Sequence, residues 1–171
     1  MYTDENKITS NISIDLWKEL YLRKRQTWLP VLSDSMGPLL RTGDHVLIQS
    51  IMPDNIKPGD IIVFKNSDKL IVHRIIRKFN NNGLLFLQKG DNTTNAGIVK
   101  SEDILGRVVA VRKRNKTICL NDSTWQMVNR ILTCFSFTAY YLRPRNPFLR
   151  RIAGFFFNEA KVLLNHKITK I

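Results

Sequence analysis

Short apolar runs, separated by turn residues, constrain the fold of this chain more than any other feature of its sequence. From Trp28 onward the runs are rich in Val, Ile, Leu and Phe: WLPVLSDSM, HVLIQSI, DIIVFKN, KLIVHRII, LLFLQKG and ILGRVVAVRK. Glycine, proline, asparagine and aspartate stand between them, as in Lys57-Pro58-Gly59-Asp60. Strands of this length with such turns are typical of an antiparallel β structure, barrel-like or coiled. We therefore predict a mainly β core, with a hairpin turn at Asn81-Asn82-Gly83.

Helical patterns flank this β core. Residues 13–25 carry apolar side chains at spacings of three and four, which predicts a short N-terminal helix. Asn121-Asp122-Ser123-Thr124 offers a helix N-cap, and the remainder has a helical pattern that prolines interrupt at 143–147. The predicted division is an N-terminal helical segment (1–27), a β core (28–120) and a basic, helical C-terminal extension (121–171).

Positive charge is concentrated at the C-terminal end. Of the net charge of +13, residues 1–111 carry +3 and residues 112–171 carry +10. Residues 148–164 combine basic side chains with an apolar stripe at helical spacing. Two interpretations stay open: residues 143–171 dock on an anionic membrane surface, or the stripe packs on the β core. Nucleic acid is the less favoured partner.

No segment of the sequence is predicted to cross a membrane or to direct export. The longest uncharged apolar stretch, residues 131–142, is shorter than the roughly 20 residues of a spanning helix. The polar N-terminus lacks the apolar region of a secretory signal peptide. We expect a cytoplasmic protein, either free or peripheral on the inner face of the membrane. Cys119 and Cys134 are expected to be buried thiols and have no metal-binding spacing, so we predict no metal and no cofactor.

Polar segments interrupt the apolar runs in a recognisable order. They read Ser35-Met36-Gly37-Pro38, Gly43-Asp44-His45-Val46, Pro58-Gly59-Asp60, Val72-His73-Arg74, Lys89-Gly90-Asp91-Asn92 and Ile104-Leu105-Gly106-Arg107-Val108. This order resembles the type I signal peptidases, in particular their endoplasmic-reticulum and archaeal-like branch. The resemblance covers about residues 28–111 and implies a signal-peptidase-like, LexA-like antiparallel β core.

The resemblance also implies a serine endopeptidase. Ser35 would be the nucleophile, and His73 would be the base, where bacterial members have a lysine. Asp91 would accept a hydrogen bond from the other imidazole nitrogen. The backbone amide of Ser35 and the hydroxyl of Ser33 would form the oxyanion hole. The substrate peptide would bind as an added strand, with small side chains in shallow pockets.

Two features depart from the family. A second acidic residue, expected a few positions after Asp91, is absent where the chain reads Asn95-Ala96-Gly97. The transmembrane anchor that usually precedes the serine is also absent. The chain therefore resembles the anchorless peptidases associated with peptide maturation, and the expected substrate is a precursor or leader peptide.

Two other functions stay open. A catalytically inactive relative could use the β fold only to bind peptide, which the missing acid favours and the presence of Ser35, His73 and Asp91 opposes. A nucleic-acid-binding regulator, similar to the self-cleaving repressors of the same fold, would suit the basic extension. Against it, residues 1–27 are too few for a DNA-binding domain. His45 lies outside the His-Arg pattern, and we interpret it as structural.

Overall fold

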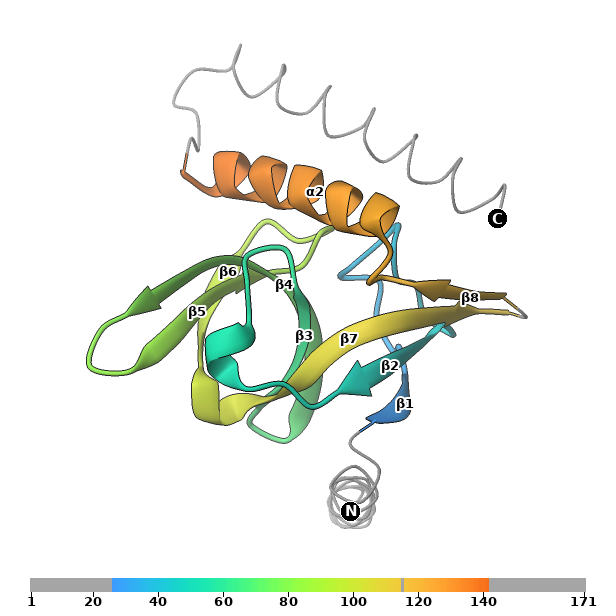
Figure 1. Cartoon of the computed structure of the whole chain (residues 1–171), viewed down its shortest axis with the longest axis horizontal. Coiled ribbons are helices and arrows are strands. Elements are labelled where there is room, and N and C mark those ends of the chain that lie inside the picture. The colour runs from blue at the N-terminus through green and yellow to red at the C-terminus, as the bar shows by residue number, and fades with distance from the viewer. Residues whose placement is uncertain (1–25, 115, 142–171) are drawn as a thin grey trace, which may run out of the picture.

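The computed structural model describes residues 26–114 and 116–141, and this part of the chain folds around one antiparallel sheet. The spatial order is β1-β2-β7-β3-β4-β5-β6, with β8 beside β7. The sheet is strongly curved, and helix α2 lies across its top in Figure 1. The elements are β1 (Gln26–Pro30), β2 (His45–Gln49), η1 (Pro53–Asn55), β3 (Ile61–Asn66), β4 (Lys69–Asn80), β5 (Leu84–Lys89), β6 (Ala96–Lys100), η2 (Ser101–Asp103), β7 (Ile104–Lys113), β8 (Lys116–Cys119) and α2 (Ser123–Tyr141).

The predicted mainly β, antiparallel core is confirmed. The hairpin between β4 and β5 turns at Asn82 and Gly83, whose φ angles of 50° and 142° suit asparagine and glycine. β6 was not predicted as a separate strand, and β8 lies at the end of the predicted β core. β6 has the sequence AGIVK and lies at the sheet edge, where Ile98 is 63% exposed. An edge strand with so little buried apolar surface has a weak sequence pattern.

Two similar turns, at residues 41–44 and 57–60, directly precede β2 and β3. In each, the third residue is a glycine with positive φ, 92° at Gly43 and 100° at Gly59. The aspartate that follows donates its backbone N–H to the carbonyl of the first residue, and its carboxylate accepts that residue's N–H. The paired residues are Arg41 with Asp44 and Lys57 with Asp60. Each Gly-Asp pair therefore forms a closed turn whose glycine is required by the backbone conformation.

Buried side chains form two clusters, one on each face of the central strands. Successive residues of a strand point to opposite faces, so Ile62 and Val63 enter different clusters. One cluster contains Phe64, Phe86 and Val99. The other contains Val31, Met36, Leu39 and Leu40 from the segment after β1 and two residues of α2, Trp125 and Leu132, which are 5% and 4% exposed. Helix α2 is therefore part of the core, and the helical pattern after residue 121 is confirmed up to Tyr141.

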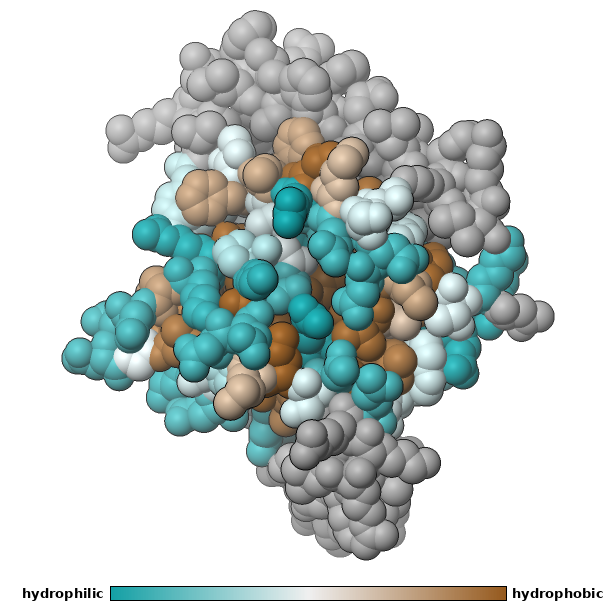
Figure 2. Space-filling model, in the orientation of Figure 1, coloured by the Kyte–Doolittle hydropathy of each residue, from teal (hydrophilic) through white to brown (hydrophobic). Residues whose placement is uncertain are grey.

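Several large hydrophobic side chains of α2 are exposed. Brown surface gathers over the helix in Figure 2, and its exposed large side chains are Met127, Ile131, Phe137, Tyr140 and Tyr141. Cys119 and Cys134 are both exposed free thiols, so the predicted burial of the thiols is wrong. Among the residues described, no helix is long and apolar enough to cross a membrane.

Several predictions fall on residues outside the described ranges. They are the N-terminal helix at 13–25 and the amphipathic segment at 148–164. The docking of residues 143–171 on a membrane, the nucleic-acid alternative and the three-part division of the chain stay predictions.

Trp125→Ala should destabilise the fold, because it removes the largest apolar side chain that α2 buries in the core. We expect a loss of about 3–5 kcal/mol in the free energy of unfolding. Met127→Ala, on the exposed side of the same helix, should change it by less than about 0.5 kcal/mol. Urea denaturation of the two variants measures the difference. Equal effects would mean that α2 does not belong to the folded core.

Candidate active site

The segment that carries Ser33 and Ser35 is held on both sides. It leaves β1, and the Asp34 carboxylate accepts hydrogen bonds from the backbone N–H and hydroxyl of Thr42, at 2.8 and 3.2 Å. Directly after Ser35, the side chain of Met36 is buried in the core. Ser35 itself is half-buried, and its hydroxyl lies 3.3 Å from the hydroxyl of Ser33. Two hydroxyls are thus presented together on a fixed backbone.

The Lys-Gly-Asp-Asn segment contacts the serine segment through its backbone. The N–H of Asn92 donates to the carbonyl of Ser35 at 2.8 Å. Gly90 permits a close approach: a Cβ added there would lie 2.6 Å from the Ser35 carbonyl oxygen and 3.0 Å from Nε2 of His73. Any side chain at this position would collide with the Ser35 carbonyl and crowd the His73 ring. Ser35 and His73, predicted from separate motifs, are therefore brought together beside Gly90.

His73 lies half-buried on β4, opposite Ile62 of β3. Its Nδ1 is hydrogen-bonded to Oε1 of Gln88 on β5, at 2.5 Å. Burial lowers the pKa of His73 below its usual 6.5. The hydrogen bond that Nδ1–H donates to Gln88 and the charge of Asp91 act to raise that pKa, and the charge of Lys89 lowers it.

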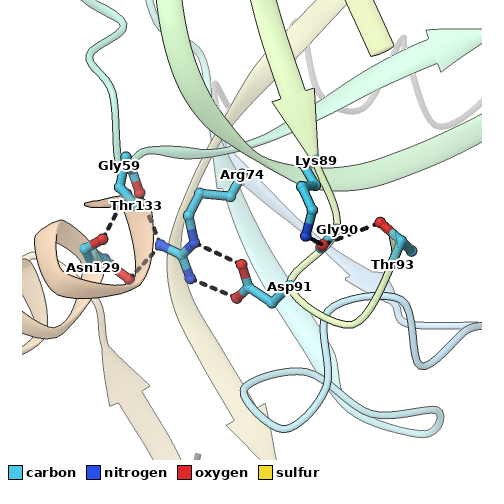
Figure 3. A network of polar contacts seen from close by, with 8 residues as sticks. All are labelled: Gly59, Arg74, Lys89, Gly90, Asp91, Thr93, Asn129 and Thr133. Carbon is cyan, nitrogen blue, oxygen red and sulfur yellow. Dashed lines mark hydrogen bonds and ion pairs between the residues drawn. The ribbon is translucent and has the colours of Figure 1, made fainter. Parts of the chain in front are cut away.

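Arg74, the next residue on β4, is 0% exposed and lies at the centre of a polar network (Figure 3). Its Nε and Nη2 donate to the two carboxylate oxygens of Asp91, at 2.8 and 2.7 Å. Its Nη1 donates to the carbonyl of Gly59 at 3.1 Å and to Oδ1 of Asn129 on α2 at 2.8 Å. One buried guanidinium therefore joins the turn before β3, the Lys-Gly-Asp-Asn segment and the helix.

The prediction that Asp91 accepts a hydrogen bond from the imidazole is wrong. The carboxylate of Asp91 binds Arg74, and Gln88 holds Nδ1 of His73. A β-bulge between Ile75 and Arg77 shifts the pairing of β4 with β5 by one residue. Such a shift moves side chains to the opposite face of a sheet. Gln88 was missed because counting from the hairpin turn without the bulge places it on the other face from His73.

The remaining site features of the described residues lie elsewhere. A pocket of about 260 Å³ is lined by Arg77, Phe79, Leu87, Ile98, Tyr140 and Tyr141, and none of the candidate catalytic residues contributes to it. In the ranges 26–114 and 116–141, no group of three or more His, Cys, Asp or Glu side chains is placed to hold a metal ion. His45 begins β2 and is exposed.

Comparison of the sequence with known proteins identifies its family. The sequence model of the family described as Peptidase S24-like matches residues 2–109. The chain therefore belongs to the Peptidase S24-like family. It is 37% identical over 90 residues to the signal peptidase complex catalytic subunit SEC11C of Homo sapiens, an alignment that covers 45% of this chain and 47% of that relative. It is 32% identical over 111 residues to the SEC11 subunit of Fusarium vanettenii, covering 56% of this chain and 64% of the relative. The resemblance to the type I signal peptidases, predicted from the motifs, is confirmed.

Asp91→Ala should destabilise the protein strongly, because it leaves the Arg74 guanidinium buried without its counter-ion. We expect a loss of about 3–5 kcal/mol in the free energy of unfolding. The control is Glu102→Ala, which breaks the exposed pair with Lys100 and should cost less than about 1 kcal/mol. Denaturant titration of both variants measures the costs. A cost for Asp91→Ala as small as that of the control would contradict a structural role for the Arg74 pair.

Proposed function

We propose that the protein is a serine endopeptidase similar to signal peptidase I, with Ser35 as nucleophile and His73 as general base. The observation that carries the proposal is the approach of Nε2 of His73 and the Ser35 carbonyl oxygen to the same point beside Gly90. A serine hydroxyl is a weak nucleophile until a base takes its proton during attack. The lowered pKa of His73 supports this role, because the neutral imidazole is then well populated at neutral pH.

The proposed reaction follows the acyl-enzyme route. The Ser35 oxygen attacks the scissile carbonyl as His73 takes the hydroxyl proton, and His73 then gives that proton to the departing amine. Water hydrolyses the acyl-enzyme with the same base. The backbone N–H of Ser35 and the hydroxyl of Ser33 would donate to the oxyanion, and the 3.3 Å separation of the two hydroxyls supports this assignment. Asp91 would act through its charge, which favours the imidazolium, and through its hold on the loop.

The proposed substrate is a leader or signal-like segment of a precursor peptide. β1 lies at the end of the strand order, pairs with β2, and leads directly into the serine segment. A sheet edge offers backbone hydrogen bonds to an extended peptide, which could bind as an added strand next to Ser35. The names of the SEC11 relatives support a peptide substrate of the signal class.

Ser35→Ala and His73→Ala should each abolish most of the activity, because the two residues would share one chemical step. We expect each to lower kcat by at least about a thousandfold, with the double variant little worse than either single one. Cleavage of a library of short precursor peptides, followed by mass spectrometry, measures the rates. Ser50→Ala and His45→Ala, at exposed positions, are the controls and should be as active as the parent. Additive losses, or full activity without Ser35, would refute the proposal.

The pH profile of kcat/KM should rise through the pKa of His73, since the base must be neutral to accept the serine proton. Burial lowers that pKa, so half of the maximal rate should be reached below pH 6.5. Activity at pH 6.5 should therefore exceed half of the plateau value, and it should fall only on further acidification. His45→Ala should leave this profile unchanged. A midpoint well above pH 6.5 would show that another group is the base.

A further inference from the structure

The contact between Gln88 and His73 determines which imidazole nitrogen can act as a base. Oε1 of the Gln88 amide can only accept a hydrogen bond, so Nδ1 of His73 must carry the proton in this contact. In the neutral ring the other nitrogen, Nε2, then has the free lone pair. Nε2 is the nitrogen that lies beside Gly90 and the Ser35 carbonyl. The contact therefore directs the basic nitrogen to the serine segment.

Gly97 provides the space in which the Gln88 amide lies. The two residues are direct partners across β5 and β6. A Cβ added to Gly97 would lie 2.7 Å from Nε2 of Gln88, which is closer than side chains tolerate. Gly97 lies in a strand and is not among the glycines with positive φ, so its backbone conformation does not require glycine. The absence of a side chain at position 97 is explained by the amide that occupies the space.

We propose that Gln88 is the positioning residue of His73, holding Nδ1–H so that Nε2 faces Ser35, and that Gly97 is its structural complement. This role rests on the peptidase function proposed above. Gln88 then accepts the Nδ1–H hydrogen bond that a carboxylate accepts in a Ser-His-Asp set, but its amide is neutral.

A neutral acceptor has an electrostatic consequence for His73. The charged groups near the imidazole are Asp91, which favours the imidazolium, and Lys89, which opposes it, while β3 contributes the apolar side chains of Ile62 and Phe64. An amide orients the ring without adding a second negative charge. The imidazole therefore stays neutral to lower pH than it would beside another carboxylate.

The first test reads the His73 ring itself and needs no substrate. Nitrogen-15 NMR of the full chain, titrated with pH, reports the tautomer and the pKa of His73. The parent should hold its proton on Nδ1. Gln88→Ala should lose this preference and lower the pKa further, and Gln88→Glu should raise the pKa by about 1–3 units. Gln49→Ala, a half-buried glutamine on β2, is the matched control and should change neither.

The second test uses Gly97 to displace the amide without removing it. In Gly97→Ala the new methyl group meets the flexible end of Gln88, so the fold can persist while the amide moves from His73. This variant should reproduce the tautomer change of Gln88→Ala. Adding Gly97→Ala to Gln88→Ala should have no further effect, because the contact is already absent.

Kinetics then connect the contact to the reaction. Gln88→Ala and Gly97→Ala should each lower kcat at least about tenfold with little change in KM, since the substrate strand is proposed to bind beside β1 and not beside the amide. The acid limb of the Gln88→Glu profile should move to higher pH together with the NMR pKa. Thermal unfolding of each variant confirms that it is folded.

The possible failures are distinguishable. If the parent holds its proton on Nε2, or if Gln88→Ala leaves the tautomer and pKa unchanged, the positioning role is overturned, while Ser35-dependent cleavage would still support the peptidase. If the NMR changes occur as expected but the parent cleaves no peptide, the contact stands and the proposed function fails.

Discussion

The buried Arg74 guanidinium is the interaction on which the rest of the site depends. A charge without solvent is tolerated only when it is paired and hydrogen-bonded, and Arg74 meets both conditions through Asp91, Gly59 and Asn129. These partners come from three separate parts of the chain. Because the guanidinium is planar and its donors have fixed directions, it sets the relative placement of all three. His73 precedes Arg74 on β4, so its backbone position is fixed by the same contacts.

Most of the fold could be predicted from the sequence because the buried strands have a clear pattern of apolar residues. β3 and β5 are short apolar runs between turn residues. In the two Gly-Asp turns, the positive φ angle explains why the residue is glycine. β6 and β8 could not be predicted in the same way. Each is short, pairs with the strand directly before it and buries one side chain, Val99 in β6 and Ile118 in β8, so its apolar pattern is weak.

The sequence motifs named segments that meet in the structure, but the side-chain contacts between them could not be predicted. The motifs correctly indicated that the segments of Ser35, His73 and Asp91 meet. The partner of the imidazole was not predictable, because it depends on one bulge between Ile75 and Arg77. A single extra residue in a strand exchanges the faces of everything beyond it, and no periodicity in the sequence reports it. The same bulge thus places Gln88 where it hydrogen-bonds His73, and Asp91 where it pairs with Arg74.

The hydrogen bond from Arg74 to Asn129 has a consequence for the evolution of the chain. Asn129 lies on α2, beyond the last strand, yet it supplies an acceptor inside the site's polar network. A chain ending after β8 would keep the described strands and every candidate catalytic residue, but it would lose both this acceptor and the helix that packs against β4. The smallest folding unit that keeps this network intact therefore extends past the sheet to include α2. A gene fusion that joins a new sequence at Leu120 should be eliminated by selection, whereas one that joins it after Tyr141 leaves the network whole.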